Sequence, residues 1–317
     1  MKHLESAFKG KNSLWRYIIL IFAVFLAANS VGAIPMIIGY AVKAATEPEA
    51  ISRLASDPKN LSQLGFDANL TLVMLLFPFL AGLVAYFFLV KPLNGRTFIQ
   101  TINGNSSIRW KRIFISGVIW IVLSAVYLIV YKGADPSNFR LNNTSGTLFW
   151  LVLISLLLIP FQAALEEIIF RGYLMQGFTV LFRKRWIPVI ITAVLFGILH
   201  AWNPEIEEYG FFTMIPQYIT FGLLFGIITV FDDGIEIAIG AHTANNIFLS
   251  IMVTNSSSIL QTPAVYEQIN IDPRIEFGAL VITAAAFFLF MKAIFKWENL
   301  TVLFRKTEPP ADGLHTG

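Results

Sequence analysis

The sequence has 317 residues, of which 56% are hydrophobic and only 14% are charged, and its mean hydropathy is +0.67. A soluble globular domain carries about 25% charged residues, so this chain has too few polar side chains to cover a water-facing surface. It has no cysteine, which excludes disulfide bonds and thiolate metal sites, and its net charge of +3 favours no class of partner. The composition therefore predicts an integral membrane protein.

Eight apolar stretches are candidates for membrane-spanning helices, which need about 20 mostly apolar residues each. In chain order they are Leu14–Val42, Leu70–Val90, Ile113–Tyr131, Leu148–Phe182, Ile187–Trp202, Phe211–Phe231, Ile235–Val253 and Phe277–Phe295. We expect an all-α bundle of about eight transmembrane helices in one membrane domain. Within it we distinguish three N-terminal helices (1–147), a core (148–253), and a loop, last helix and tail (254–317). The basic segment before the first run favours a retained helix over a cleaved signal peptide.

Basic residues gather in alternate loops of the predicted bundle. The segment Lys91–Arg112 holds five Lys and Arg and no acid, and Arg183–Arg185 form the next basic turn. Since Lys and Arg accumulate in cytoplasmic loops, we expect both termini in the cytoplasm. One predicted cytoplasmic loop disagrees, because Asp232, Asp233 and Glu236 occur there without Lys or Arg. Acidic residues contribute little to this rule, so the predicted orientation stays.

The fourth run contains three charged residues, Glu166, Glu167 and Arg171. Each charge at the bilayer centre costs about 2.5–3.5 kcal/mol, so their presence requires compensation. At about 1.5 Å per residue, Glu167 lies roughly 24 Å from Arg183, near the middle of a long helix. The alternative is a helix that ends near Leu165, which would leave the carboxylates at the membrane interface.

Helical spacing predicts different roles for the two glutamates. Glu167 and Arg171 are four residues apart with the acid first, which is the favourable order for an ion pair on one helix face. Glu166 points about 100° away and has no such partner. An unpaired carboxyl group in an apolar environment suits a general base, so we assign the chemistry to Glu166.

Two later helices add histidines and an asparagine. His200 ends the fifth run, and His242 and Asn246 lie four residues apart on one face of the seventh. Each histidine alone is more typical of a structural hydrogen bond, but the combination with Glu166 on three helices indicates function. His242 is only about 10 Å from the start of its run. The hairpin Phe231–Gly234 would therefore have to lie below the membrane surface.

These residue types point to hydrolysis of a carbonyl substrate. Glu166 and the histidines can hold and deprotonate a water molecule, and Asn246 can donate a hydrogen bond to a developing oxyanion. Glu166, His200 and His242 are also a plausible zinc-binding set, so the residues leave open a zinc ion or no cofactor. The motifs of serine hydrolases (Gly-x-Ser-x-Gly) and zincins (His-Glu-x-x-His) are absent from the sequence.

Three motifs resemble those of the CPBP family of intramembrane proteases, which includes the CAAX-prenyl endopeptidases and the bacterial Abi proteins. They are Glu-Glu-x-x-x-Arg at Glu166–Arg171, Phe-x-x-x-His at Phe196–His200 and His-x-x-x-Asn at His242–Asn246. The resemblance spans about residues 149–250. It implies an eight-helix core and endoproteolysis within the membrane, by a metalloprotease or by a glutamate-activated water.

The resemblance also implies roles for single residues. Glu166 would activate the water, His200 and His242 would assist or bind a metal, and Asn246 would contribute to an oxyanion hole. Glu167, Arg171 and Phe196 would support the site structurally. We expect membrane lipid and a protein or peptide substrate, prenylated or not, as partners, and no nucleic acid.

Two alternatives stay open at this point. Some family members are associated with bacteriocin immunity or act as scaffolds, so a non-catalytic role is one alternative. The other is an ion-coupled transporter, because intramembrane Glu and His residues also mark ion paths. The lack of a repeat between the two halves of the sequence argues against a transporter.

Overall fold

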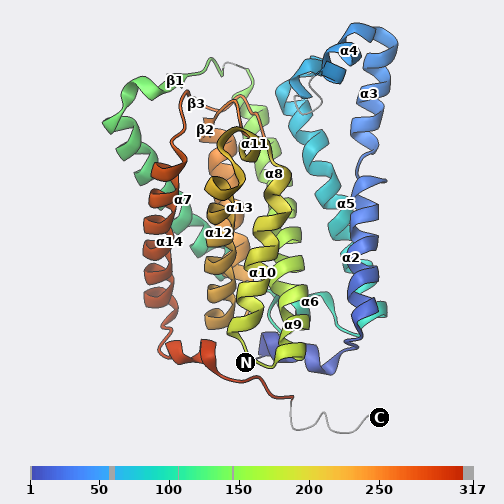
Figure 1. Cartoon of the computed structure of the whole chain (residues 1–317), viewed down its shortest axis with the longest axis vertical. Coiled ribbons are helices and arrows are strands. Elements are labelled where there is room, and N and C mark those ends of the chain that lie inside the picture. The colour runs from blue at the N-terminus through green and yellow to red at the C-terminus, as the bar shows by residue number, and fades with distance from the viewer. Residues whose placement is uncertain (1, 57–60, 106, 145, 310–317) are drawn as a thin grey trace.

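Long helices run side by side along one axis of the molecule, and a small β-sheet and short helices lie at one end (Figure 1). The computed structural model describes residues 2–56, 61–105, 107–144 and 146–309. The helices are α1 (Lys2–Glu5), α2 (Leu14–Asn29), α3 (Ile34–Thr46), α4 (Pro48–Ser56), α5 (Ala68–Asn94), α6 (Phe98–Ile102), α7 (Trp110–Ala134), α8 (Leu148–Glu167), α9 (Met175–Phe182), α10 (Trp186–Leu199), α11 (Pro204–Tyr209), α12 (Phe211–Asp232), α13 (Glu236–Met252) and α14 (Pro273–Phe295). Strand β3 (Tyr266–Gln268) lies between β1 (Phe139–Leu141), to which it is antiparallel, and β2 (Val253–Thr254), to which it is parallel.

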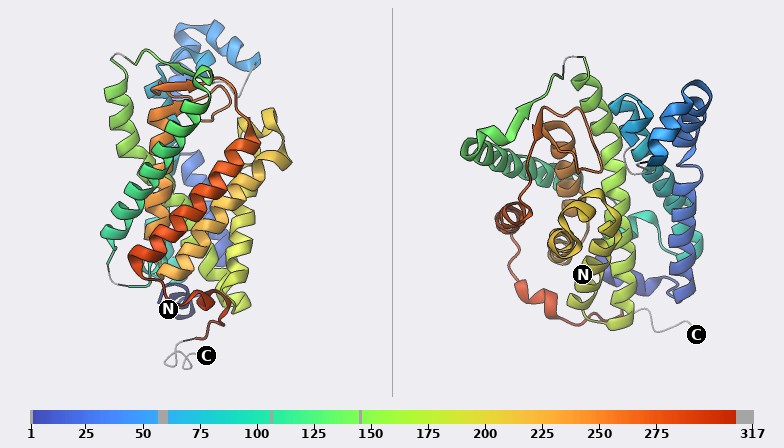
Figure 2. Two further views of the ribbon diagram at one scale, coloured as in Figure 1. Left: turned by 90° about the vertical axis from the view of Figure 1, so that its left-hand side faces the viewer. Right: turned by 45° about the horizontal axis from the view of Figure 1, so that its top comes forward.

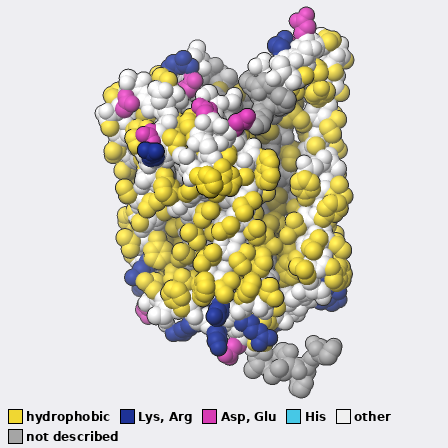
Figure 3. Space-filling view, in the orientation of Figure 1, with side chains coloured by type: hydrophobic (Ala, Val, Ile, Leu, Met, Phe, Trp, Pro, Cys, Tyr) yellow, Lys and Arg dark blue, Asp and Glu magenta, His cyan; other side chains and the backbone are white. Residues whose placement is uncertain are grey.

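Six helical stretches in the described part of the chain are long and apolar enough to cross a membrane. They are Leu14–Thr46, Ala68–Asn94, Trp110–Ala134, Leu148–Phe182, Phe211–Asp232 and Pro273–Phe295. The fifth and seventh predicted runs form shorter helices, namely Trp186–Trp202 and the 17-residue α13. Exposed apolar side chains make a belt between two ends that carry the charges (Figure 3). The prediction of an all-α membrane bundle is confirmed, and the protein is an integral membrane protein.

Several helix ends follow from residues with known capping behaviour. The carboxylate of Asp67 accepts hydrogen bonds from the backbone N–H groups of Asn69 and Leu70, which begins α5. Gly95 ends the same helix in the left-handed conformation, with φ of 67°, which glycine adopts without steric cost. Asp272 caps α14 in the same way as Asp67 caps α5.

The helix that carries Glu166 continues far beyond it. α8 passes directly into a π-helical segment, Ile168–Leu174, and then into α9, which Arg183 ends in the left-handed conformation. The alternative of a helix that ends near Leu165 is therefore wrong. Single π-helical turns often occur inside α-helices at functional sites. The π-helical segment here begins one residue after Glu167.

Helix α13 lies against both α7 and α8, and α12 packs on α10. The contact between α7 and α13 is closest at Gly240, where a Cβ atom would collide with Oγ of Ser116 and the carbonyl oxygen of Ile113. Beside this contact, Trp120, Phe225 and other apolar side chains form a buried core. The absence of a side chain at Gly240 thus lets α13 approach its neighbours.

The acidic hairpin between α12 and α13 is covered by the N-terminal segment, which lies beneath the bundle (Figure 2). The carboxylate of Asp233 accepts the backbone N–H groups of Lys2 and His3 at 2.8 and 2.9 Å. The guanidinium of Arg109 donates to Glu236, with 2.9 Å between Nε and Oε1. These contacts bury the hairpin inside the protein, and Arg109, from the basic segment before α7, supplies the positive charge that the hairpin's own sequence lacks.

Candidate active site

Glu166 lies at the C-terminal end of α8, with its side chain buried. Its Oε1 accepts a hydrogen bond of 2.6 Å from Nε2 of Gln162, one helical turn earlier. Its Oε2 is buried and has no hydrogen-bond partner among the described residues. Among basic side chains in the described part of the chain, the one nearest to Oε2 is His242, whose Nε2 lies 3.8 Å away. This distance is too long for a direct hydrogen bond and leaves one carboxylate oxygen available.

Glu167 has two partners on one carboxylate oxygen and is fully buried. Its Oε1 accepts from Nη1 of Arg171 at 2.9 Å and from Nδ1 of His242 at 2.8 Å. The expected ion pair with Arg171 is present, and the contact with His242 is additional. Because a carboxylate only accepts, Nδ1 carries the hydrogen, and Nε2 of a neutral His242 has a free lone pair. Glu167 therefore orients the histidine as well as neutralising the arginine.

The hydrogen bond between Glu167 and His242 also shows that His242 lies at the depth of the glutamates. Sequence spacing suggested that this residue lies shallower than Glu166, but the buried hairpin carries the start of α13 well inside the protein. His242 reaches both glutamates from there. Its ring also stacks on Phe225 of α12, with centroids 5.7 Å apart and planes at 24°.

Phe196 of α10 is the aromatic centre of the site. The guanidinium carbon of Arg171 lies 4.4 Å from its ring centroid, which is a cation–π geometry. The ring centroids of His200 and His242 lie 4.6 and 6.1 Å from it. The buried arginine is thus stabilised by one carboxylate and by aromatic faces, and Phe196 separates the two histidines.

His200 occupies the first position after α10, where the helix tightens into a 3₁₀ turn, His200–Trp202. Its Nδ1 donates to the carbonyl oxygen of Phe196 at 2.8 Å, so the neutral ring has an unprotonated Nε2. The ring stacks on Tyr218 of α12, with centroids 4.2 Å apart and planes at 17°. Within the described residues, no hydrogen bond or ion pair joins His200 to Glu166 or His242.

Asn246 is connected to the site by hydrogen bonds to two other side-chain amides. Its Nδ2 donates to Oε1 of Gln162 at 2.9 Å, and its Oδ1 accepts from Nδ2 of Asn245 at 3.0 Å. Sequence analysis missed Gln162 and Asn245. A signal was present for Gln162, because it precedes Glu166 by four residues and is polar in an apolar run.

The three candidate zinc ligands do not assemble in this arrangement. Glu166 and His242 approach each other, but His200 is held against Phe196 and Tyr218. The parts of the chain that the structure describes contain no group of three His, Asp or Glu side chains that could hold a metal ion.

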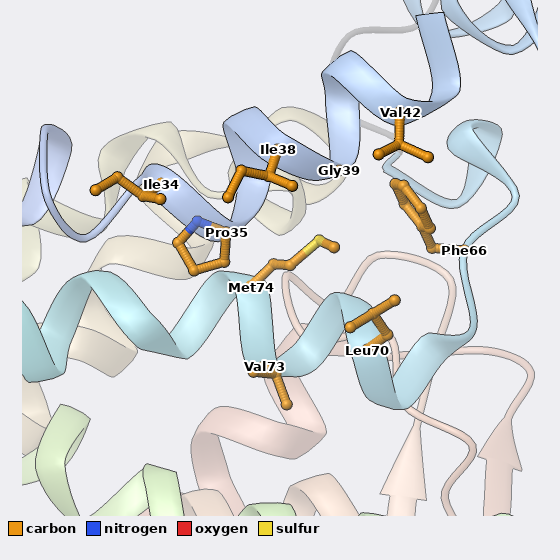
Figure 4. A pocket seen from close by; sticks show the side chains of 9 residues that line it. All are labelled: Ile34, Pro35, Ile38, Gly39, Val42, Phe66, Leu70, Val73 and Met74. Carbon is orange, nitrogen blue, oxygen red and sulfur yellow. The ribbon is translucent and has the colours of Figure 1, made fainter. Parts of the chain in front are cut away.

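An apolar pocket of about 460 Å³ lies elsewhere, between α3 and α5 and the loop before α5 (Figure 4). The described residues that line it are all apolar, among them Ile38, Phe66 and Met74, so none of them is an acid, a base or a nucleophile.

The similarity of the chain to known proteins includes the region that contains this site. Residues 145–248 match the family described as Type II CAAX prenyl endopeptidase Rce1-like. The chain is 31% identical over 252 residues to a protein of Bacillus subtilis (strain 168), described as uncharacterized protein YyaK. The aligned part covers 79% of this chain and 82% of the Bacillus protein. No solved structure matches the chain.

Proposed function

Because the chain belongs to the Rce1-like family of type II CAAX prenyl endopeptidases, we propose that it is an intramembrane endopeptidase in which Glu166 activates a water molecule. The family relationship supports a peptidase embedded in the membrane.

One observation carries the mechanism: Oε2 of Glu166, which has no hydrogen-bond partner in the described part of the chain, lies 3.8 Å from Nε2 of His242. A water molecule within hydrogen-bond distance of both atoms would be held by a base and by an oriented imidazole. Glu166 takes a proton from the water as its oxygen bonds to the peptide carbonyl carbon. The same carboxyl group then gives the proton to the leaving amine as the C–N bond breaks, which yields a carboxylic acid and an amine.

Asn246 would stabilise the negative charge that develops on the carbonyl oxygen. Its amide nitrogen has two hydrogens, and one of them is used in the bond to Gln162. The second hydrogen is free for the oxyanion, and such a donor contributes about 10²–10³-fold to the rate. We assign His200 an assisting role next to this centre, because it contacts the centre through Phe196.

The substrate we propose is a protein segment near a C-terminus or next to the membrane. The reacting groups are buried between helices of a membrane bundle, which suits a substrate that is itself associated with lipid. The family description makes a prenylated C-terminal peptide the first candidate. The same peptide without the prenyl group is the comparison.

We further propose that the protein lies in a bacterial plasma membrane with both termini in the cytoplasm. Helix α1 and the C-terminal end of α14 lie at one end of the molecule (Figure 1), and Lys and Arg gather at that end on the face in Figure 3. This distribution follows the positive-inside rule.

The test uses the purified protein in phospholipid vesicles with a fluorogenic peptide that ends in a farnesylated CaaX sequence. We expect cleavage at one bond, identified by the masses of both products, and none in vesicles without the protein. The unprenylated peptide, tested in parallel, shows whether the prenyl group is recognised. Absence of cleavage of both peptides by folded protein would contradict the proposal.

A further inference from the structure

A row of hydrogen-bonded side chains connects Glu166 to the core of the bundle. From Gln162, whose amide donates to Glu166, the row continues through Asn246 to Asn245. Oδ1 of Asn245 then accepts from the indole nitrogen of Trp120 on α7, at 3.1 Å. We call Gln162, Asn246 and Asn245 the amide relay. It joins three helices, α8, α13 and α7, through bonds of 2.6–3.1 Å.

The two ends of the amide relay determine the orientation of every amide between them. An indole N–H can only donate, and an ionised carboxylate can only accept. Asn245 must therefore turn its oxygen to Trp120 and its NH₂ group to Asn246. Asn246 must in turn present its NH₂ group to Gln162. A reversed amide at any position would bring two acceptors or two donors together.

Trp120 is well suited to anchor this order. It is only 1% exposed, and its ring packs on Phe225 and Phe287 with centroids 6.2 and 5.0 Å away. Phe225 also stacks on His242. A rigid, donor-only group of the core thus supports the asparagine through hydrogen bonds and the histidine through ring contacts.

We propose that Trp120, Asn245 and Gln162 are positioning residues that hold the NH₂ group of Asn246 on the side of Glu166, where an oxyanion donor is needed. This inference rests on the proposed endopeptidase function. It assigns no direct contact with substrate to Trp120 or Asn245, which act through Asn246. If these residues served only the stability of the fold, the hydrogen bonds would have to form. It would not matter which amide donates and which accepts.

The required direction of these hydrogen bonds can be tested with two substitutions of Asn245. Asn245→Asp keeps the shape but offers oxygens to both neighbours, so Asn246 must turn its NH₂ group away from Gln162. Asn245→Leu removes the donor without imposing a reversal. We expect kcat for the farnesylated reporter to fall about tenfold in Asn245→Leu and further in Asn245→Asp, with KM changed less than twofold. Equal kcat in both variants and the wild type, at unchanged folding, would overturn the proposal.

Trp120→Phe has a matched control in Trp297→Phe. Trp297 lies in the same hydrophobic core and donates its own indole N–H to Asp232 at 3.3 Å, away from the amide relay. We expect about tenfold lower kcat for Trp120→Phe and unchanged kcat for Trp297→Phe. Because Trp120 acts through Asn246, adding Trp120→Phe to Asn246→Ala should cause no further loss. A similar effect of both tryptophan variants, or additive losses, would contradict the positioning role.

A second readout does not depend on catalysis. In protein labelled with ¹⁵N-tryptophan, Trp120→Phe identifies the indole resonance of Trp120 among the seven tryptophans. Asn245→Leu should shift this resonance and leave that of Trp297 unchanged, and an unshifted resonance would disprove the hydrogen bond. If the bond is present but the wild type cleaves neither peptide, the endopeptidase proposal fails while the contact stands. If the wild type cleaves and the resonance does not shift, only the amide relay fails.

Discussion

Oε1 of Glu167 lies 2.8 Å from Nδ1 of His242 and 2.9 Å from Nη1 of Arg171, so one buried oxygen serves a histidine and an arginine. An ion pair between two residues of one helix would only neutralise the charges of those two residues. The second bond makes Glu167 the link between that pair and the centre that contains Glu166. Stability and catalysis should therefore respond differently when the pair is removed.

Glu167→Ala should lower the free energy of unfolding by about 3–5 kcal/mol, because it leaves the buried guanidinium of Arg171 without its counter-charge. Adding Arg171→Met should restore part of that stability, since no unpaired charge remains. Cleavage should stay low in the double variant, because His242 still lacks its acceptor. Thermal unfolding in detergent and reporter cleavage measure the two effects. Recovery of both together would show that Glu167 serves only the ion pair.

The two histidines should differ in importance. Nε2 of His242 lies 3.8 Å from Oε2 of Glu166, whereas among the described residues no hydrogen bond or ion pair joins His200 to that glutamate. We expect His242→Ala to lower kcat more than His200→Ala, and a zinc chelator to leave wild-type cleavage unchanged. Equal losses, or activity that is lost with a chelator and restored by zinc, would indicate that all three residues share a metal.

Gly240 provides a test of the contact between α7 and α13. Gly240→Ala should lower the free energy of unfolding by about 1–3 kcal/mol, because its Cβ collides with Ser116 and with the backbone at Ile113. Gly133→Ala on α7 is the matched control, since none of the described neighbouring groups lies within 4 Å of a Cβ there. That substitution should be neutral or stabilising by about 0.5–1 kcal/mol. Similar stabilities of both variants would contradict the close approach.

His3 should make stability depend on pH. Its ring is fully buried, and Nε2 donates to the carbonyl oxygen of Arg171 at 3.1 Å. Burial lowers the pKa of His3, against the opposing charges of Asp233 and Glu236. Below the usual pKa of about 6.5, the unfolded chain therefore binds a proton that the folded chain resists. The stabilisation is complete above that pH and is lost as the pH falls below it.

The comparison is between the wild type and His3→Gln, whose amide can donate to the same carbonyl oxygen. The fall in melting temperature from pH 7.5 to pH 5.5 should be smaller in His3→Gln. The same fall in both proteins would assign the pH dependence to other groups.

The motifs predicted most of the residues at the centre, but not how they are connected. Residue spacing within a helix predicts local pairs, and the pair Glu167–Arg171 is of this kind. The bonds from Asn246 to Gln162 and from Trp120 to Asn245 cross between helices, and their partners depend on tertiary packing. No spacing rule connects residues more than 80 positions apart.

Spacing along α13 required the hairpin before it to lie below the membrane surface, but it did not show which residues bury the hairpin. Its burial depends on Arg109 and on the N-terminal residues Lys2 and His3, which come from distant segments. The eight helical runs, by contrast, follow from composition along the chain and were predictable.

The most direct test of the central claim is the cleavage rate of Glu166→Gln in phospholipid vesicles, with Glu49→Gln as the control. Both variants replace a carboxylate by an amide, but Glu49 is exposed on α4, outside the site. Because the amide cannot accept the proton of water, Glu166→Gln should cleave the reporter about 10²–10⁴-fold more slowly at an unchanged melting temperature, while Glu49→Gln keeps wild-type activity. Wild-type cleavage by folded Glu166→Gln would contradict the role of Glu166 as the base.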